Sequence, residues 1–296
     1  MKYTYFPGCS LEATAAPYQT SISAVSSLLG LEFEELKDWN CCGATAYMSI
    51  KEITAYALSS RNLALAEKQG NDLVSPCSAC FTNLNKTNVY LREFPELKEK
   101  IDIVLNEVGL KYSGRVNIRH LLDVFVRDVG YEQLAAKVKV KLEGLKVAPY
   151  YGCQTVRPKA MFDDPEMPVS LDRLISHLGA QPVHFPMKSR CCGGSLSVTK
   201  EKLGLRMIKN ILLCAAQNEA DCIVTTCPMC QINLDAYQKK INKIYKEKFS
   251  IPIIYFTQLM GLAFGVPAKK LALNKTIVPV KPVLGKYYSK RSAISG

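Results

Sequence analysis

The sequence contains little histidine, one tryptophan and no long apolar run. The three histidines, His120, His177 and His184, lie away from the cysteine motifs described below, which disfavours mixed Cys/His zinc sites. The most apolar stretch, residues 251–267, is shorter than the roughly 20 residues that a membrane-spanning helix needs. We therefore expect no membrane span, and we expect this stretch to form a buried strand followed by a helix.

An export signal is missing as well, because the first residues, MKYTYFPGCS, have no apolar core and no small-residue cleavage site. We therefore expect a cytoplasmic protein. In a reducing compartment, 12 cysteines predict metal ligands or catalytic groups rather than disulfides. A composition that is 48% apolar and 22% charged is typical of a folded globular protein, and 296 residues suggest two domains.

Acidic residues are in the minority, with 26 Asp and Glu against 38 Lys and Arg. The excess is concentrated at the end of the chain, where residues 267–296 contain seven basic residues and no acidic one. No nucleic-acid-binding motif accompanies this basic tail, so we expect it to contact a protein partner or an anionic ligand and expect no nucleic-acid partner.

The cysteines form an internal repeat. Each copy has a first cysteine, a Cys-Cys-Gly stretch after 31 or 37 residues, and a Cys-x-x-Cys after 34 more. A shift of 150 residues also superposes apolar and asparagine positions around the last motif, such as Asn83 on Asn233. We therefore predict two similar domains, residues 1–144 and 145–296.

Each copy alternates strands with helices. We expect strands at residues 3–6, 32–36 and 72–75 in the first copy and at 147–151, 182–185 and 222–225 in the second. A helix over residues 51–69 and a final strand and helix complete the first copy. This alternation predicts an α/β protein with a small parallel sheet in each domain, flanked by helices. Ligands then lie beyond the carboxyl ends of the strands, where the first cysteine and the Cys-x-x-Cys fall.

Five cysteines per copy exceed the four ligands of structural zinc or of a simple cubane cluster. Two adjacent cysteines also point in different directions and so reach two metal atoms more easily than one. We expect an iron–sulfur site in at least one copy, with zinc or another structural metal in one of the two as the alternative.

These motifs resemble the heterodisulfide reductase B-subunit family, which is defined by two cysteine-rich "CCG" domains. The resemblance covers nearly the whole length and is carried by GCQTVRPKAMFDDPEMP (residues 152–168), CCGGS (191–195) and IVTTCPMCQINLD (223–235). It implies Rossmann-like domains and two non-cubane 4Fe–4S clusters, each on five cysteines. The two implied ligand sets are Cys9, Cys41, Cys42, Cys77 and Cys80, and Cys153, Cys191, Cys192, Cys227 and Cys230.

The resemblance also implies an activity, the reductive cleavage or the formation of a disulfide that is held between the two clusters. The family's methanogenic substrate is anionic, so four basic residues near the second-copy cysteines are candidates for substrate binding: Arg157, Lys159, Lys188 and Arg190. The alternative for these four is a solvated basic rim. Acidic residues in the FDDPE stretch are expected to shape a loop or contact a partner rather than to transfer protons.

Two features separate this chain from the methanogen pattern. The residue after the first cysteine pair is Gly43, where a proline in a CCPAPG-like run is frequent, which suggests a different disulfide substrate. The chain also lacks a ferredoxin-type cysteine run. The resemblance therefore implies two heterodisulfide reductase partners, a ferredoxin-like protein of the C-subunit type with cubane clusters and a flavin-bearing protein of the A-subunit type.

Two other functions stay open at the level of sequence. The first is an electron-transfer subunit of another oxidoreductase with CCG domains, and the second is a zinc-stabilised binding module. The remaining cysteines, Cys214 and Cys222, are expected to pack in the core, and His120 is expected to pack or to cap a helix.

Overall fold

The structure is a computed structural model that describes residues 1–44, 47–158, 162–194 and 196–288. Its first half has four strands, β1 (Lys2–Tyr5), β2 (Glu32–Glu35), β3 (Leu73–Ser75) and β4 (Ile118–His120), and the second half has β5 (Lys146–Tyr150), β6 (Gln181–Pro182), β7 (Cys222–Thr225) and β8 (Ile253–Tyr255). The strands form two parallel sheets with the orders β2-β1-β3-β4 and β6-β5-β7-β8. The predicted α/β class and the paired parallel sheets are confirmed.

The helices follow the strands in matching order. In the first half they are α1 (Ala16–Leu29), α2 (Tyr47–Ile50), α3 (Glu52–Gln69), α4 (Ser78–Glu93), α5 (Pro95–Glu107), α6 (Leu121–Asp123), the π-helix η1 (Val124–Gly130) and α7 (Tyr131–Ala136). In the second half they are α8 (Ser170–His177), α9 (Leu196–Thr199), α10 (Glu201–Gln217), α11 (Pro228–Ala236), α12 (Gln238–Tyr245) and α13 (Phe256–Ala263). Helix α3 begins one residue after the predicted start, and strand β6 is two residues shorter than predicted.

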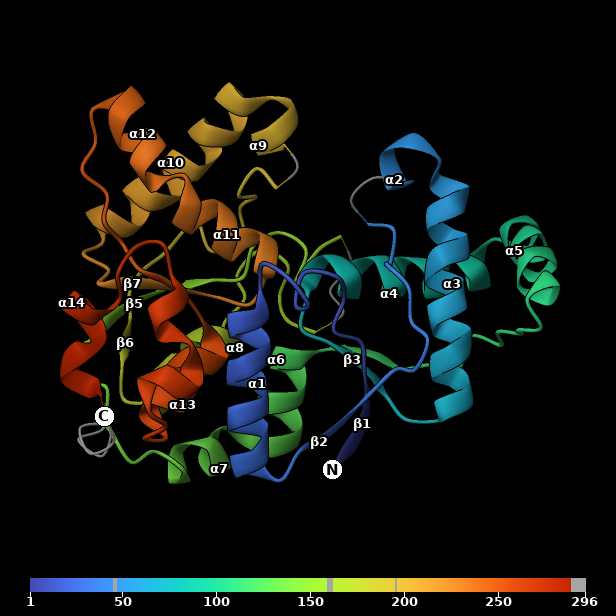
Figure 1. The fold of residues 1–296 in the computed structure, drawn as a ribbon, viewed down its shortest axis with the longest axis horizontal. Coiled ribbons are helices and arrows are strands. Elements are labelled where there is room, and N and C mark those ends of the chain that lie inside the picture. The colour runs from blue at the N-terminus through green and yellow to red at the C-terminus, as the bar shows by residue number, and fades with distance from the viewer. Residues whose placement is uncertain (45–46, 159–161, 195, 289–296) are drawn as a thin grey trace.

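The two sheets share one central core. Side chains alternate along each strand, so Tyr5 and Val224 face the middle of the molecule whereas Phe6 and Ile223 face outward. Figure 1 shows α1, α6 and α8 toward the middle with α13 beside them, α3 and α5 at one side, and α10 and α12 at the other. Each half therefore has its own outer core, while the inner core belongs to both.

Helix α1 of the first half packs on α13 of the second half. Tyr18 stacks on Tyr255 with ring centroids 4.0 Å apart, and the hydroxyls of Ser21 and Thr257 lie 2.6 Å apart. Helix α7 packs on α8 in the equivalent way. Because apolar burial is the main stabilising contribution, the two halves stabilise each other through this interface.

The basic tail is folded onto the second half. It contains η2 (Ala268–Leu271), η3 (Leu273–Lys275), α14 (Lys281–Leu284) and η4 (Gly285–Tyr287). Its apolar side chains are buried, namely those of Leu271, Leu273, Val278, Val280, Leu284 and Tyr287. Its five described lysines are exposed, so a partner contact through their charge stays a prediction, but the tail itself is part of the core.

Candidate cysteine-rich redox site

The two Cys-x-x-Cys motifs lie at the carboxyl ends of β3 and β7, as the strand pattern predicted. Cys77 is the N-cap residue of α4 and Cys227 is the N-cap residue of α11. Cys80 and Cys230 follow in the first turn of each helix, and all four side chains are buried. The positive end of each helix dipole faces these sulfurs, but contacts with neighbouring thiols raise the pKa of Cys77, Cys80 and Cys230.

The cysteine pairs are held by a glycine turn in both halves. Gly43 has φ +78° and Gly193 has φ +82°, and the N–H of each donates to the sulfur of the first cysteine of its pair at 3.4 and 3.3 Å. A Cβ on either glycine would lie 3.1 Å from backbone of the neighbouring helix. Since proline is fixed near φ −65°, this turn cannot accept the proline that is frequent in methanogen sequences.

The first cysteine of each half is brought to its Cys-x-x-Cys by another glycine. Gly8 has φ +72°, and a Cβ there would lie 2.8 Å from the sulfur of Cys80. Gly152 has φ +68°, and a Cβ there would lie 2.8 Å from the sulfur of Cys230. The backbone before Cys9 and Cys153 therefore passes directly over a sulfur, which only glycine permits.

Within each half the sulfurs contact one another. The sulfurs of Cys42 and Cys80 lie 3.3 Å apart. The hydrogen bond between the thiols of Cys153 and Cys191 lowers the pKa of Cys191 to about 6 and raises that of Cys153. Cys9, Cys41 and Cys191 are exposed, so each cysteine group reaches from the interior to the surface.

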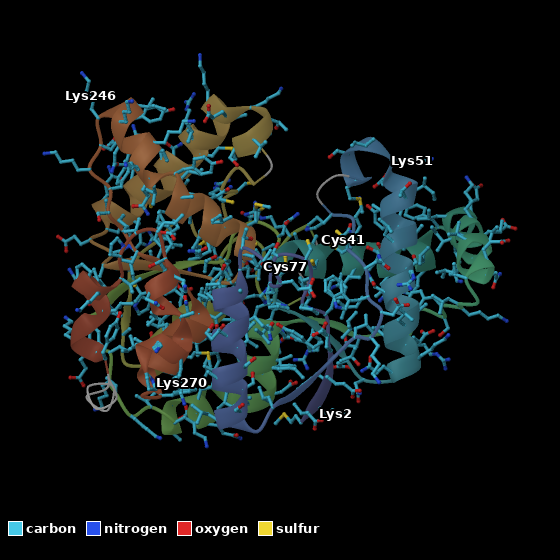
Figure 2. All side chains as sticks on the ribbon, in the orientation of Figure 1. Lys2, Cys41, Lys51, Cys77, Lys246 and Lys270 are labelled. Atoms are coloured by element: carbon cyan, nitrogen blue, oxygen red, sulfur yellow. The ribbon has the colours of Figure 1, made fainter. Side chains whose placement is uncertain are left out.

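The two cysteine groups meet at the interface. The thiol of Cys77 is hydrogen-bonded to that of Cys227, and this contact is the main reason that the pKa of Cys77 is raised. The pKa of Cys227 is lowered, chiefly by Cys230 and then by Cys77. Figure 2 shows Cys77 in the middle of the molecule and Cys41 farther toward the first half. One set of cysteines therefore continues directly into the other.

The donor set fits an iron–sulfur cluster in chemical type. All ten cysteines are unpaired thiols, and soft thiolate ligands select iron–sulfur clusters, zinc or copper(I). Among the described residues, no three cysteine, histidine or acidic side chains converge on one point as ligands of a single metal ion. Sulfurs grouped in pairs along a continuous path suit a centre with several metal atoms better than one ion.

A buried polar chain crosses the interface beneath the cysteines. His120 lies at 3.4 Å from the hydroxyl of Ser78, which lies 2.7 Å from that of Thr155, and Thr155 lies 3.1 Å from the hydroxyl of Thr226. The Nδ1 atom of His120 accepts the Leu122 N–H, so Nε2 carries the proton. Burial lowers the pKa of His120 to about 4 and keeps the ring neutral.

The prediction that His120 packs or caps a helix is confirmed, since it is the N-cap residue of α6. The rest of this polar chain was not predicted from the sequence. Thr155 and Thr226 lie two residues after Cys153 and one residue before Cys227, and neither has a hydroxyl counterpart in the other copy, which has Leu11 and Pro76. These two differences between the copies are the sequence feature that could have indicated a polar contact in this region.

The four basic candidates differ in accessibility. Lys188 is buried, and its ammonium contacts the carboxylate of Asp172 at 2.7 Å and the Pro168 carbonyl at 2.9 Å. Because Lys188 is buried and paired, it stabilises the fold and is not accessible to a substrate. Arg190 is exposed, and Lys159 lies outside the described residues.

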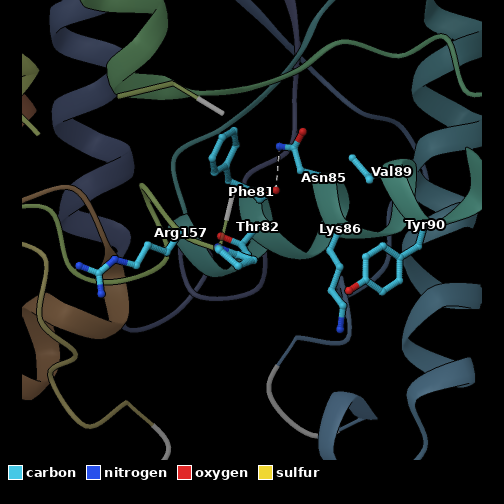
Figure 3. A pocket seen from close by; sticks show the side chains of 8 residues that line it. Phe81, Thr82, Asn85, Lys86, Val89, Tyr90 and Arg157 are labelled. Carbon is cyan, nitrogen blue, oxygen red and sulfur yellow. Dashed lines mark hydrogen bonds between the residues drawn. The ribbon is translucent and has the colours of Figure 1, made fainter. Parts of the chain in front are cut away.

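Arg157 lines a cavity of about 220 Å³ between the halves. Pro158 lines it beside Arg157, and residues of α4 form the other wall, namely Phe81, Thr82, Asn85, Lys86, Val89 and Tyr90. Figure 3 shows Arg157 at one end of this cavity, with its guanidinium extending away from α4, and Lys86 on α4 toward the other end. Arg157 also donates to the Pro165 carbonyl at 2.9 Å and contacts Glu166 at 3.1 Å. The hydroxyl of Thr82 donates to the Gln154 carbonyl, which fixes this wall to the loop after Cys153.

The acidic FDDPE stretch shapes its loop, as one of the two expectations stated. Asp163 accepts hydrogen bonds from the N–H groups of Val169 and Ser170 at the start of α8. Asp164 accepts from the N–H groups of the two residues that follow Pro165. Cys222 is fully buried as expected, whereas Cys214 is only partly buried.

A comparison with known protein families identifies the type of domain in this chain. The family model of the cysteine-rich domain, CCG, matches residues 3–85 and 147–235. Each match ends a few residues after a Cys-x-x-Cys. The molecule is thus a tandem pair of cysteine-rich domains.

Relatives then give the family. The B subunit of a ferredoxin/F420H2-dependent CoB-CoM heterodisulfide reductase from Methanosarcina acetivorans is 30% identical over 292 residues, which cover 97% of each chain. A protein from Archaeoglobus profundus, named for its likeness to the heterodisulfide reductase B subunit, is 32% identical, over 92% of this chain and 93% of that protein. The chain belongs to the heterodisulfide reductase B-subunit family.

A further relative is named as a subunit of a different enzyme, a fumarate reductase. The "8-methylmenaquinol:fumarate reductase membrane anchor subunit" of Wolinella succinogenes is 36% identical over 279 residues, which cover 94% of this chain and 97% of that protein. In the part of this chain that the structure describes, no helix has the length and apolar character needed to cross a membrane.

A solved structure supports the fold. A hypothetical protein from Helicobacter pylori superposes with a TM-score of 0.77 over 94% of this chain at 18% identity. The match covers 52% of the Helicobacter chain, so this chain spans about half of that protein.

Proposed function

We propose that this chain is the iron–sulfur subunit of a multisubunit redox complex and that it cleaves or forms a disulfide between two non-cubane 4Fe–4S clusters. The first ligand set is Cys9, Cys41, Cys42, Cys77 and Cys80, and the second is Cys153, Cys191, Cys192, Cys227 and Cys230. The names of the heterodisulfide reductase relatives support the redox class, and the cysteine-only donor set supports the type of cofactor.

The observation that carries this proposal is the meeting of the two Cys-x-x-Cys motifs. Cys77 and Cys227 contact each other across the interface, and each begins a helix that leads away into its own half. Two redox groups held by these motifs are adjacent, so the two sulfurs of one disulfide can face one group each. A lone cysteine-rich domain could not offer this arrangement.

When bound, such clusters supply electrons and open iron coordination to substrate sulfur. The overall reaction consumes two electrons and two protons for each disulfide that becomes two thiols. The chain's own residues exclude water and orient the substrate. Arg157 lines the cavity between the halves, and its guanidinium is paired with Glu166 beside it; a positive charge at this position would favour an anionic substrate. The neutral His120 holds the interface rather than donating a proton, because its pKa is about 4.

We propose that the electrons come through partner proteins, a ferredoxin-like protein of the C-subunit type with cubane clusters and a flavin-bearing protein of the A-subunit type. The chain has no ferredoxin-type cysteine run of its own to carry electrons from a distant donor. A cytoplasmic location stays a prediction.

A second candidate function is electron transfer without disulfide chemistry. It is favoured by the 36% identity to the Wolinella protein, whose name belongs to a fumarate reductase. The glycine at position 43 also separates this chain from the methanogen pattern, and its turn cannot hold proline. In this candidate the adjacent clusters pass electrons between partner proteins.

One experiment separates the candidates. Protein purified without oxygen is analysed for iron and sulfide, oxidised, and titrated with a panel of anionic and neutral thiols while its electron paramagnetic resonance spectrum is recorded. A new cluster signal on thiol addition supports disulfide chemistry. Normal iron with no response to any thiol supports electron transfer, and near-zero iron and sulfide with bound zinc supports the zinc-stabilised module.

The ligand sets are tested by matched changes in the two cysteine pairs. Cys42→Ser is expected to distort the signal of the first cluster alone, and Cys192→Ser that of the second. Cys222→Ser is the control, because this buried cysteine lies outside both sets. If either pair variant removed both signals, the two sites would not be independent.

A further inference from the structure

The tail of the second half is held by two side chains that have equivalents in the first half. Asp235 of α11 accepts hydrogen bonds from the N–H groups of Ile277 and Val278, at 2.8 and 2.9 Å. Gln258 of α13 donates to the Leu271 carbonyl at 2.9 Å. The tail segment of residues 271–278, which contains the 3-10 helix η3, therefore runs across α11 and α13 and is bound through its backbone.

The internal repeat gives the first-half equivalents directly. The shift of 150 residues that superposes β3 on β7 places Asn85 of α4 on Asp235. The pairing of β4 and β8 with these strands gives a shift of 135, which places Asp123 of α6 on Gln258. The two tail-binding positions of the second half thus correspond to Asn85 and Asp123.

In the first half these two positions line an open cavity of about 480 Å³. Its walls are α4, the extended segment 114–119 that ends in the edge strand β4, and the start of η1, with Phe162 of the second half at its border. We call it the α4–β4 groove. The Nδ2 atom of Asn85 donates to the Phe81 carbonyl at 3.0 Å, and the side-chain oxygen of Asn85 points away from α4 (Figure 3). That oxygen can accept a backbone N–H as Asp235 does.

The charge of the groove differs from that of the tail-binding surface. Among the described residues that line it, Asp123 is the one carboxylate, against Arg92, Arg115, Arg119 and Arg127. Arg119 is neutralised by Asp123 and Asp128, each at 2.6 Å. Arg92 and Arg115 are exposed at the rim. The groove therefore has a positive rim, whereas the second half binds its basic tail through a carboxylate.

We infer that the α4–β4 groove is a docking site for an acidic polypeptide segment of a partner protein. The segment would lie across α4 and η1 as the tail lies across α11 and α13, with its backbone on Asn85 and its carboxylates at Arg92 and Arg115. The inference goes beyond the redox chemistry of the cysteines, because it needs no cofactor and no electron transfer.

The test uses the full chain and two labelled peptides. The first has the tail sequence of residues 271–280, LALNKTIVPV, and the second is the acidic version LALEETIVPV, with Asn274→Glu and Lys275→Glu. Binding is followed by fluorescence anisotropy. We expect the acidic peptide to bind about tenfold more tightly than the tail peptide at about 50 mM salt, and expect the difference to shrink at about 300 mM salt.

Matched variants locate the binding. Arg92→Glu with Arg115→Glu is expected to weaken the acidic peptide about tenfold or more, because two attractive charges become repulsive. Arg92→Lys with Arg115→Lys keeps the charge and is expected to retain most of the affinity. Arg206→Glu, an exposed change on α10 of the second half, is the control and should leave binding unchanged.

Several results would overturn the inference. These are equal affinity for the two peptides, no binding of either at about 1 mM, or an unchanged affinity in the double glutamate variant. Full displacement of the peptide by about 10 mM citrate would instead assign the groove to a small anion. Because iron content is measured on the same samples, loss of peptide binding with normal iron is separable from failure of the redox proposal.

Discussion

The two halves carry the same cysteine framework but differ in what surrounds it. In the second half the tail covers the surface beside α11, and the buried residue at the end of the edge strand is Tyr255. In the first half the equivalent surface is an open groove, and the equivalent residue is His120. The cysteine positions are thus duplicated, while the contacts with the rest of the molecule have diverged.

The tail is the largest difference between the halves, and its deletion tests how much it contributes to stability. Deletion of residues 268–296 removes six buried apolar side chains and uncovers the surface they pack on; at about 1.5–3 kcal/mol each, their burial approaches the whole stability of a typical domain. We expect the variant to be insoluble or to lack a cooperative thermal transition by circular dichroism.

The control for the deletion changes only charge. Lys269→Ser with Lys270→Ser alters exposed lysines and should leave the melting temperature within a few degrees. The sequence-based expectation that the tail contacts a protein partner or an anionic ligand stays a prediction beside this one. A deletion variant that melted like the full chain would show that the tail is peripheral.

Both halves have a glycine that passes close to a cysteine sulfur, Gly8 and Gly152, and substitution of each tests whether the two positions are equivalent. Gly8→Ala and Gly152→Ala each combine positive φ with a Cβ 2.8 Å from a sulfur. We expect each to destabilise the protein by about 2 kcal/mol or more and to reduce iron in its own half. Urea unfolding and iron analysis measure the two effects.

Gly30→Ala separates backbone strain from contact with sulfur. Gly30 also has positive φ, +66°, but a Cβ there would have no neighbour within 4 Å. We expect this variant to cost about 1 kcal/mol and to keep its iron. An equal loss of iron in Gly30→Ala and Gly8→Ala would mean that the close approach to Cys80 is unimportant.

His120 makes the first half sensitive to acid in a way that Tyr255 does not make the second. Its folded-state pKa is about 4, below the ordinary value of 6.5, so the unfolded chain takes up a proton first as the pH falls. Stability is complete above pH 6.5 and is lost between that pH and 4. At pH 5 the loss amounts to about 2 kcal/mol.

Urea unfolding at pH 7.5 and pH 5 measures this loss in the wild type and in His120→Gln. The glutamine variant is less stable at pH 7.5, because the Leu122 N–H loses its ring acceptor, but its stability should fall less by about 2 kcal/mol between the two pH values. An identical pH dependence in both proteins would contradict a buried neutral His120.

The sequence predicted the parts of the fold and site that depend on local pattern. The cysteine spacing, the strand before Cys77 and the helix over residues 52–69 follow from short-range pattern, and the structure has the strand and the helix within one residue of where they were expected. The contact between Cys77 and Cys227 and the buried Lys188–Asp172 ion pair depend on how distant elements pack. Lys188 illustrates the limit, because a lysine beside a cysteine pair looks like a ligand contact until its burial is known.

The smallest expected effect compares Asp235 with Asn85. Asp235→Asn leaves one of the two tail N–H groups without a carboxylate oxygen, which costs about 1–2 kcal/mol. Burial raises the pKa of Asp235, which means that the buried carboxylate is itself unfavourable. Above this pKa the neutral asparagine avoids that penalty, so we expect a net loss of about 1 kcal/mol. Asn85→Ala removes a single hydrogen bond, from Nδ2 to the Phe81 carbonyl, whereas Asp235→Ala removes both tail contacts, so Asn85→Ala should lower the melting temperature by less than Asp235→Ala does. If Asn85→Ala were the more damaging of the two, the Asn85 oxygen would already have a partner inside the first half, and the correspondence between the groove and the tail-binding surface would fail.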